Sequence, residues 1–410
     1  MNKTVWIVNQ YASTPEYGYA GRHYYLGQEL AKQGYKAYLI TSASHHLLRE
    51  KPKLDGMFKL EEHGGLTVVW VNMPSYAEAH SKQRALTWFL FPWRIQRLAK
   101  LIHDKPDTIL CSSPSLISFL GAQRLAKKYR AKLVFEVRDI WPLTLIEVGG
   151  YSPRHPFIRL MQWVEDKAYR DSVAVISNLK NAVEHMASRG MPREKFAWVP
   201  NGISLEEINL KTPLSTSAKE ALPKNRFIIG YTGTLGVANA LDTLIEAAEL
   251  LRDYPELAFV LVGDGKEKTK LQKLVANKNL SNVYFIDPIP KVEVQAMLAC
   301  FDVCYIGWLN DDLYRFGIGA NKIPEYFYSG KPVVHAYNGA YDPVTEVSAG
   351  IQVKAEDSNS LAEGILSFFQ LSEKDRNSMG SNGRKAALQQ YEYSQLAKKM
   401  ADILFKETAL

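Results

Sequence analysis

The chain has 410 residues, of which 46% are hydrophobic and 23% charged, a soluble globular composition whose length predicts two domains of about 200 residues. No apolar run reaches the roughly 18 residues of a membrane-spanning helix, and residues 1–10 lack the apolar core of a signal peptide, so we expect neither. The net charge of +7 is uneven: residues 1–202 hold 28 Lys and Arg against 17 Asp and Glu, whereas residues 203–410 hold 22 against 26, which predicts an anionic partner for the first half.

Apolar, β-rich runs in the first half alternate with helical patterns. The predicted strands are 4–9, 37–41, 67–71, 108–111, 132–137 and 173–177, and the clearest helical patterns are 22–33 and 115–129. This alternation predicts parallel strands joined by helical crossovers.

The alternation stops at 199–225, a polar stretch with three prolines that we interpret as a linker. It resumes with predicted strands at 227–231, 259–263, 283–286, 303–306 and 332–337, and with a helix at 241–251 that has one apolar stripe. We therefore predict an α/β protein with two doubly wound, Rossmann-like domains, 1–202 and 203–391. The glycine-rich turns at 17–21, 231–236, 262–265 and 316–320 should face a cleft between them.

The stretch FGIGANKIPEYFYSGKPVVHAY, residues 316–337, carries the clearest chemistry. Gly317 and Gly319 would let the backbone approach a ligand, and the helix that begins near Asn321 would offer unpaired N–H groups to a phosphate. Lys322 adds a cation, and Glu325 could accept hydrogen bonds from two ribose hydroxyls. The alternative is purely structural, with Asn321 as an N-cap and Glu325 complementing the helix dipole.

This stretch also resembles a known family. GANKIPEYFYSGKPVV is similar to the nucleotide-sugar segment of glycosyltransferase family 4, whose members have the two-domain GT-B fold and retain the anomeric configuration of the donor. YTGTLGVANALDTLIEAA, FVLVGDGKEKTKLQ and VPNGI match further landmarks in the same order. EVRDIWPLTLIEVGG and NQYASTPEYGYAGRHYYLGQEL resemble a bacterial subgroup encoded with surface-polysaccharide genes, so the resemblance covers essentially the whole chain.

The resemblance implies a role for each matching residue. Glu325 would hold the donor ribose, the loop from Gly317 to Lys322 would meet the diphosphate and sugar, and residues 285–290 would bind the base. The implied donor-binding residues are Gly18, Arg22, Thr234, Gly236, Gly263, Ile289, Arg315, Gly317, Gly319, Asn321, Lys322 and Glu325. The implied acceptor-side residues are Tyr19, Arg138, Asp139 and Trp141, and the implied catalytic ones are Asp139, Lys322 and Glu325. The C-terminal helix, about 392–410, would pack back on the first domain.

Three positions depart from the family pattern. The first of the family's paired glutamates is replaced by Gly317, its basic pair falls near the neutral Thr234 and Asn239, and its histidine after the fourth strand falls on Ser113. The diphosphate would then be met by Lys322 and backbone N–H groups, with Arg22 or Arg315.

The resemblance implies catalysis by positioning and charge stabilisation, without a protein nucleophile, cofactor or metal. The pair Asp311–Asp312 could be read as a metal site, but no other carboxylate or histidine lies near in sequence, which favours a solvated loop. Asp139 could be an acceptor-side general base. Alternatively, it caps the turn before Trp141 and pairs with Arg138.

The segment RALTWFLFPWRIQRLAK, residues 84–100, mixes aromatic and basic side chains. Such a mixture suits a membrane interface, and the basic first half favours that interpretation, with Trp88 and Trp93 buried in lipid beside Arg94, Arg97 and Lys100. The alternative is a core helix packed on the sheet. We find no recognised nucleic-acid motif, so nucleic acid is not an expected partner.

Together these features predict a hexosyl- or N-acetylhexosaminyltransferase that moves a sugar from a UDP-sugar to a lipid-linked saccharide in surface-polysaccharide assembly. It would be cytoplasmic, because its three cysteines lack C-x-x-C spacing, and peripheral at the inner membrane face, as a monomer or homodimer. Two alternatives remain: a UDP-sugar 2-epimerase on the same fold, and a non-catalytic GT-B binding protein.

Overall fold

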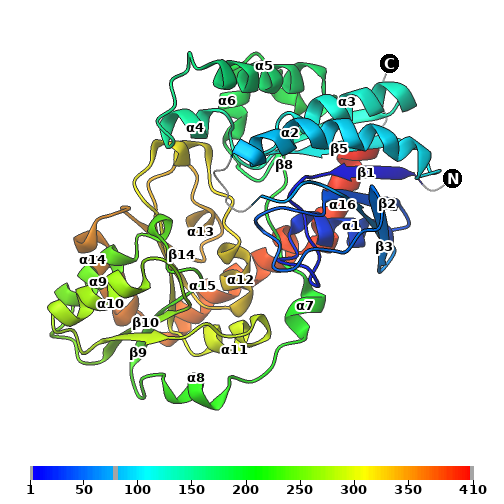
Figure 1. Cartoon of the computed structure of the whole chain (residues 1–410). Helices are drawn as coiled ribbons and strands as arrows, with labels where there is room; N and C mark the ends of the chain where they lie inside the picture. The colour runs from blue at the N-terminus through cyan, green and yellow to red at the C-terminus, as the bar shows by residue number, and fades with distance from the viewer. Residues whose placement is uncertain (1–2, 77–81, 407–410) are drawn as a thin grey trace. The chain divides into compact units, whose positions relative to one another are not determined.

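The computed structural model describes residues 3–76 and 82–406, which form two compact units (Figure 1). Unit 1 contains Met1–Asn201 and Tyr393–Leu410, and unit 2 contains Gly202–Glu392. The last helix therefore returns to the first unit, where the rings of Tyr25 and Tyr393 stack with centroids 5.0 Å apart.

Unit 1 is built on an eight-stranded sheet in the order β3-β4-β2-β1-β5-β6-β7-β8, parallel except for β3. Its strands are β1 (Thr4–Val8), β2 (Lys36–Ser42), β3 (Phe58–His63), β4 (Leu66–Val71), β5 (Thr108–Ser112), β6 (Lys132–Val137), β7 (Ala174–Ser177) and β8 (Phe196–Trp198). The central β1 and β5 are buried along their whole length, as expected for parallel strands covered on both faces.

The helices of unit 1 connect these parallel strands. They are α1 (Arg22–Lys32), α2 (Lys82–Arg94), α3 (Ser118–Tyr129), α4 (Leu143–Glu147), α5 (Pro156–Asp171), α6 (Ala182–Ser188) and α16 (Tyr393–Phe405). The core on one side of the sheet joins α1 and α16, and it includes the fully buried Leu30 and Leu404.

Unit 2 is built on a six-stranded, all-parallel sheet in the order β11-β10-β9-β12-β13-β14. Its strands are β9 (Phe227–Thr232), β10 (Leu257–Val262), β11 (Val283–Ile286), β12 (Val303–Gly307), β13 (Val333–Ala336) and β14 (Gly350–Val353). Its helices are α7 (Leu205–Asn209), α8 (Thr216–Glu220), α9 (Leu241–Leu250), α10 (Lys268–Asn277), α11 (Val294–Ala299), α12 (Lys322–Ser329), α13 (Pro343–Glu346), α14 (Ser358–Gln370) and α15 (Glu373–Ala386), which continues into a π-helix (Ala387–Tyr391).

The structure corrects two details of the sequence-based organisation. The stretch predicted as a linker contains α7 and α8, and Thr212 N donates to Val292 O (2.9 Å), which ties it to unit 2. The edge strand β3 was not predicted. Within the described residues, no helix is both long and apolar enough to cross a membrane.

Candidate active site

The glycine-rich loop of unit 2 ends where α12 begins. Gly317 has φ +98°, a conformation that L side chains rarely adopt, so a glutamate at this position would be strained. This backbone geometry explains why the chain carries glycine where the family pattern has its first glutamate. Asn321 occupies the N-cap position of α12, but its side chain makes no capping hydrogen bond.

Lys322, the first residue of α12, lies against the end of β9. Its Nζ donates to Asn239 Oδ1 (3.0 Å) and lies 5.1 Å from the ring centroid of Tyr231. A Cβ on Gly233 would come within 2.6 Å of Lys322 Cε, so glycine is needed for this approach. The cation therefore sits beside the neutral positions where the family pattern has its basic pair.

The environment of Lys322 alters its acidity. Burial lowers the pKa of Lys322 to about 8, and Glu325 opposes that effect. A half-buried ammonium whose hydrogen bond goes to a neutral amide has no negative charge beside it in that contact. An anion at the start of α12 would supply that charge, because the helix N-terminus and the cation attract the same charge.

Glu325 lies one turn further along α12 and forms an ion pair with Lys291, which follows β11. Gln295 Nε2 donates to the Glu325 backbone oxygen (3.2 Å), so the segment after β11 is held against α12. The sequence analysis did not identify Lys291. The ion pair between Lys291 and Glu325 places the predicted ribose-binding carboxylate next to residues 285–290, the predicted base-binding segment.

The remaining predicted donor residues of unit 2 lie on the loops at the same ends of its strands, whereas Gly18 and Arg22 belong to unit 1. Gly263 N donates to Ile286 O (3.0 Å), and a Cβ on Gly263 would clash with the Gly233 oxygen at 2.0 Å, so the turns after β9, β10 and β11 are in contact. Thr234 and Gly236 belong to the turn after β9, Ile289 is partly buried after β11, and Gly319 and the exposed Arg315 belong to the loop before α12.

The pair Asp311–Asp312 forms part of a local cap. Asp311 Oδ1 accepts a hydrogen bond from Leu313 N (2.8 Å) at the start of a short 3-10 helix. The described residues contain no group of three His, Cys, Asp or Glu side chains that could hold a metal ion.

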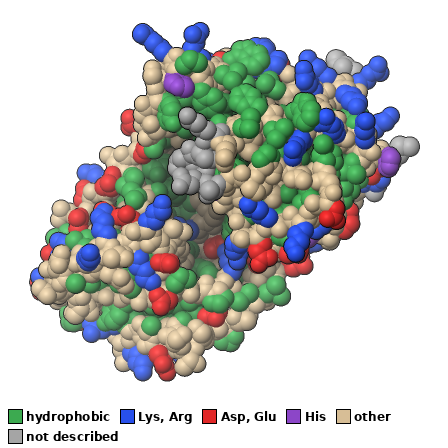
Figure 2. Space-filling view, viewed as in Figure 1, with side chains coloured by type: hydrophobic (Ala, Val, Ile, Leu, Met, Phe, Trp, Pro, Cys, Tyr) green, Lys and Arg blue, Asp and Glu red, His purple; other side chains and the backbone are tan. Residues whose placement is uncertain are grey.

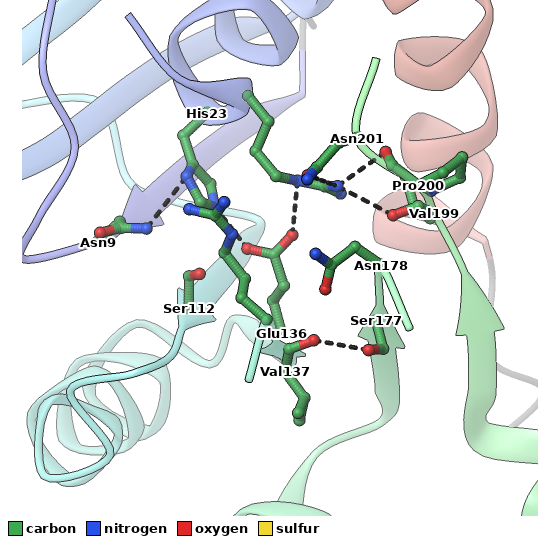
Figure 3. A network of polar contacts seen from close by, with 12 residues as sticks. Asn9, His23, Ser112, Glu136, Val137, Ser177, Asn178, Val199, Pro200 and Asn201 are labelled. Carbon is green, nitrogen blue, oxygen red and sulfur yellow. Dashed lines mark hydrogen bonds and ion pairs between the residues drawn. The ribbon is translucent and has the colours of Figure 1, made fainter. Parts of the chain in front are cut away.

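In unit 1, the buried side chain of Glu136 binds two residues of α1 near the C-terminal ends of the parallel strands (Figure 3). Glu136 in β6 is fully buried, and its Oε1 lies 3.0 Å from Arg22 Nε while its Oε2 contacts His23 Nε2. Asn9 Nδ2 lies 3.0 Å from His23 Nδ1, which places the ring proton on Nε2, facing the carboxylate.

Arg22 also forms hydrogen bonds with residues 199–201, where the first of the two chain segments of unit 1 ends. Its Nη1 donates to Val199 O (2.9 Å), Pro200 O (2.8 Å) and Asn201 Oδ1 (3.2 Å). Arg22 is only 2% exposed, so its first role is structural. Its predicted contact with the diphosphate stays a prediction. The sequence analysis missed Glu136 and His23, although a charged residue inside the apolar run KLVFEV was a signal.

The charges of this cluster are unbalanced. Burial alone would raise the pKa of Glu136, but the surrounding side chains hold that pKa below its usual range, so the carboxylate is ionised. Burial lowers the pKa of His23, so the imidazole is neutral near pH 7. Two guanidinium groups, those of Arg22 and Arg138, thus lie near one carboxylate, and of the two it is Arg22 that forms the ion pair with it.

The contacts of Asp139 match the turn-capping alternative. Its Oδ2 accepts from Trp141 Nε1 (2.9 Å), and its Oδ1 accepts from Thr144 Oγ1 (2.8 Å). The expected pairing with Arg138 does not occur among the residues that the structure describes. Tyr19, from the glycine-rich loop that Gly18 begins, is 58% exposed.

The aromatic segment of unit 1 divides between core and surface, so the core interpretation is confirmed for part of it and membrane contact of the exposed part stays a prediction. Trp88, Phe91, Ile95 and Leu98 are buried, and Trp88 Nε1 donates to Tyr11 Oη. Leu86, Phe89 and Trp93 share the opposite, exposed face of α2, and Arg97 lies 3.7 Å from the Trp93 ring centroid. Figure 2 shows apolar and basic side chains gathered over α2 and α5. The prediction that Trp88 is buried in lipid is wrong, because its ring belongs to the core.

Two family models match the chain. The model described as "Glycosyl transferase 4-like domain" matches residues 18–202, and the model described as "Glycosyl transferases group 1" matches residues 215–386. The matches divide the chain at the same place as the two structural units.

Individual proteins are similar over much of the chain. The putative colanic acid biosynthesis glycosyl transferase WcaI of Escherichia coli is 24% identical over 287 residues, which are 68% of this chain and 69% of WcaI. Among solved structures, Anabaena Alr3699/HepE in complex with UDP and glucose has a TM-score of 0.66 at 18% identity, covering 98% of this chain and 99% of that one. WaaG, a glycosyltransferase involved in lipopolysaccharide biosynthesis, has a TM-score of 0.66 at 15% identity, covering 98% and 100%.

Proposed function

Because the chain belongs to the GT-B glycosyltransferases of family 4, we propose that it transfers a sugar from a UDP-sugar to a lipid-linked saccharide during bacterial surface-polysaccharide assembly, with retention at the anomeric carbon. The observation that carries this proposal is the arrangement at α12, where a half-buried cation and, one turn later, a carboxylate stand at the helix N-terminus. Lys322 meets the diphosphate and Glu325 meets the ribose. The names of WcaI and WaaG support the polysaccharide context, and the HepE complex supports UDP as the nucleotide.

The reaction follows from the charges of this site. When the bond from the sugar to the diphosphate breaks, negative charge grows on the leaving phosphate. Lys322 and the N–H groups of α12 stabilise that charge, which lowers the barrier. The donor phosphate itself accepts the proton of the acceptor hydroxyl as that oxygen attacks the anomeric carbon, so the protein needs no general base of its own. The acceptor oxygen bonds to the carbon that the diphosphate leaves, and no protein nucleophile takes part. Asp139 and Trp141 contribute to the acceptor side.

Calorimetric titration of UDP tests the donor site. We expect Glu325→Ala to lower the affinity for UDP roughly tenfold to hundredfold, because a hydrogen bond from a hydroxyl to a carboxylate is charge-assisted and contributes about 1.5–3 kcal/mol. Glu325→Gln, which keeps one acceptor oxygen, should lose less. Glu246→Ala, which removes an exposed carboxylate from α9 of the same unit, is the matched control and should bind UDP normally. Unchanged affinity in a folded Glu325→Ala protein would refute the ribose assignment.

Turnover separates the proposed activity from the two alternatives. A transferase releases UDP from a UDP-sugar only when a bacterial membrane extract supplies the acceptor, and labelled sugar enters the lipid fraction. A 2-epimerase changes the free donor without the extract. A non-catalytic protein binds UDP and does neither.

We expect sugar transfer to continue in excess EDTA, because Lys322 and the helix N-terminus already offset the charge of the diphosphate. The assay is transfer into the membrane extract before and after chelation, with a known Mn²⁺-dependent transferase in the same buffer as the control. Activity that disappears with EDTA and returns with Mg²⁺ or Mn²⁺ would overturn the expectation and make Asp311–Asp312 the first place to look for the metal.

Membrane attachment is part of the proposal, and the exposed face of α2 supports it. Phe89 and Trp93 would enter the lipid, while Arg97 and Lys100 would meet anionic headgroups. Since apolar burial is not screened by salt, Phe89→Ser/Trp93→Ser should reduce binding to anionic vesicles at low and at high salt. Arg97→Glu should act mainly at low salt.

Co-sedimentation with phosphatidylserine vesicles and with neutral vesicles measures this attachment. Leu210→Ser/Leu250→Ser removes two exposed apolar side chains of unit 2 and should sediment like the wild type. If the α2 double variant also sediments like the wild type, this face does not contact the membrane.

A further inference from the structure

The charged cluster around Glu136 leaves one of its arginines without a counterion. The two carboxylate oxygens are used by Arg22, whose Nε lies 3.0 Å from Oε1, and by His23. Arg138, two residues further along the chain, is close enough to help lower the pKa of Glu136, but it reaches no carboxylate among the described residues. A buried charge is normally paired, because removing it from water is costly.

The hydrogen bonds of this cluster are also incomplete. Arg138 Nε is buried and has no hydrogen-bond partner within residues 3–76 and 82–406, and the same is true of Arg22 Nη2. The backbone of Arg138 is fixed, because its N–H donates to Ser113 Oγ (2.8 Å). Asp139, the nearest carboxylate in sequence, is already bound to Trp141 and Thr144. Two neighbouring guanidinium groups therefore each keep an unused donor.

The position of this cluster suggests a ligand. Arg138 follows the carboxyl end of β6 in a parallel sheet, the edge at which α/β proteins bind their ligands. Figure 3 shows Glu136 at that edge, with His23 and Asn178 on either side of it. Arg138 is partly exposed as a whole residue, although its Nε atom is buried.

We propose that Arg138, supported by Arg22, binds an oxyanion carried by the acceptor, either a phosphate or a carboxylate. A planar guanidinium offers paired N–H donors to such a group, and one negative charge would neutralise the cluster. The inference rests on the proposed transferase function and narrows its acceptor to an anionic one. In this arrangement Glu136 keeps the two arginines together, and Arg138 touches the substrate.

Calorimetry with the full chain saturated with UDP tests the proposal, because UDP then occupies the donor site. Inorganic phosphate and glucuronate are the two probes. We expect at least one of them to bind the wild type, and Arg138→Met to weaken that binding roughly tenfold to hundredfold. Arg138→Lys keeps the positive charge but loses the paired N–H donors of the guanidinium, so its affinity for the probe should lie between those of the wild type and Arg138→Met. Arg124→Met, which removes an exposed arginine from α3 of the same unit, should bind like the wild type.

The preferred probe identifies the source of the anion. Tighter binding of phosphate indicates a phosphorylated acceptor, and tighter binding of glucuronate indicates a uronic-acid residue in the saccharide. Either result supports the proposal. Equal binding by the wild type and Arg138→Met, or no binding of either probe to the wild type, would overturn it. The UDP titration is read separately, so a failed donor site is not mistaken for a failed acceptor site.

The melting temperature of Arg138→Met is a second readout, because a ligand-binding role and a structural role of Arg138 predict different changes in it. If Arg138 is kept for a ligand, Arg138→Met removes an uncompensated charge and should melt no lower than the wild type in buffer without phosphate. A clearly lower melting temperature would assign Arg138 to the fold and count against the proposal.

Discussion

Replacing Lys322 with methionine is expected to lower the rate of sugar transfer by about a hundredfold to a thousandfold, the usual effect of removing one preorganised group that stabilises charge in a transition state. The effect should be large because the basic pair of the family pattern is absent here. Thr234 and Asn239 are neutral, and Asn239 instead orients the ammonium of Lys322 through a 3.0 Å hydrogen bond. If the proposed donor site is right, Lys322 provides the charge that two residues share in the family pattern.

The pH dependence of UDP binding follows from the same residue. Burial lowers the pKa of Lys322 to about 8, so the free protein loses this charge as the pH rises through 8. A bound diphosphate favours the protonated form. The affinity for UDP should therefore be full below about pH 7 and should fall by up to about tenfold for each further unit above 8. Lys322→Met should bind weakly at every pH, without that slope.

The matched control for this change is Lys270→Met. Lys270 belongs to α10 of the same unit, its side chain is 66% exposed, and it pairs only with Glu267 at the surface. Release of UDP from a panel of UDP-sugars, with membrane extract as the acceptor, measures the rate, and calorimetry from pH 6 to 9.5 measures the affinity. A Lys322→Met protein that keeps the wild-type rate and pH slope would show that another group meets the diphosphate.

The family and the GT-B fold, both predicted from the resemblance of the motifs, are confirmed. The two parallel sheets could also be predicted without that resemblance, because most of their strands are apolar runs. Strands such as β5 and β10 are buried on both faces, so they appear as unbroken apolar stretches. The strand β3, FKLEEH, is a half-exposed edge strand with alternating burial, and β8 has only three residues. Neither leaves a run long enough to be recognised.

At the candidate site, the sequence revealed residues that are close together in the chain but not contacts between distant residues. Lys322 and Glu325 were predicted because they stand within one turn of a single helix. Lys291 was missed, because its ion pair with Glu325 joins residues 34 positions apart. The partners of Glu136 come from α1, 113 positions earlier in the chain for His23. Contacts that depend on the register between distant strands cannot be found from local spacing.

The same reasoning explains the segment 84–100. Its aromatic residues were treated as one group, although helical periodicity places Trp88 and Phe91 on the core face and Phe89 and Trp93 on the exposed face. The period was present in the sequence, but choosing the face that meets the sheet requires the neighbouring element. The stacking of Trp88 on Phe157 of α5, at 5.7 Å between centroids, settles that choice.

The second large effect concerns stability. Glu136→Gln keeps the shape of the side chain but removes the charge that pairs with Arg22 and lies near Arg138. Breaking a buried ion pair by removing one partner costs about 3–5 kcal/mol, because the remaining charges stay buried. For a unit of this size the melting temperature should fall by roughly 6–20 °C. Calorimetry of the full chain measures the change, and Glu184→Gln, which breaks an exposed pair with Arg193, should leave the transition unmoved.

The pH dependence of this loss identifies its cause. The folded-state pKa of Glu136 is lowered, so its stabilising effect is complete above the unfolded value of about 4.3 and is lost as the pH falls below it. The difference in stability between wild type and Glu136→Gln should accordingly be largest near pH 7 and should narrow below about pH 4.3, where the carboxyl takes up a proton in the unfolded chain but stays ionised in the folded one. A difference that stays constant from pH 7 to pH 3 would mean that the variant disturbs packing instead of charge. Combining Glu136→Gln with Arg138→Met should restore part of the stability, because the second change removes a neighbouring cation whose repulsion of Arg22 is no longer offset by the carboxylate.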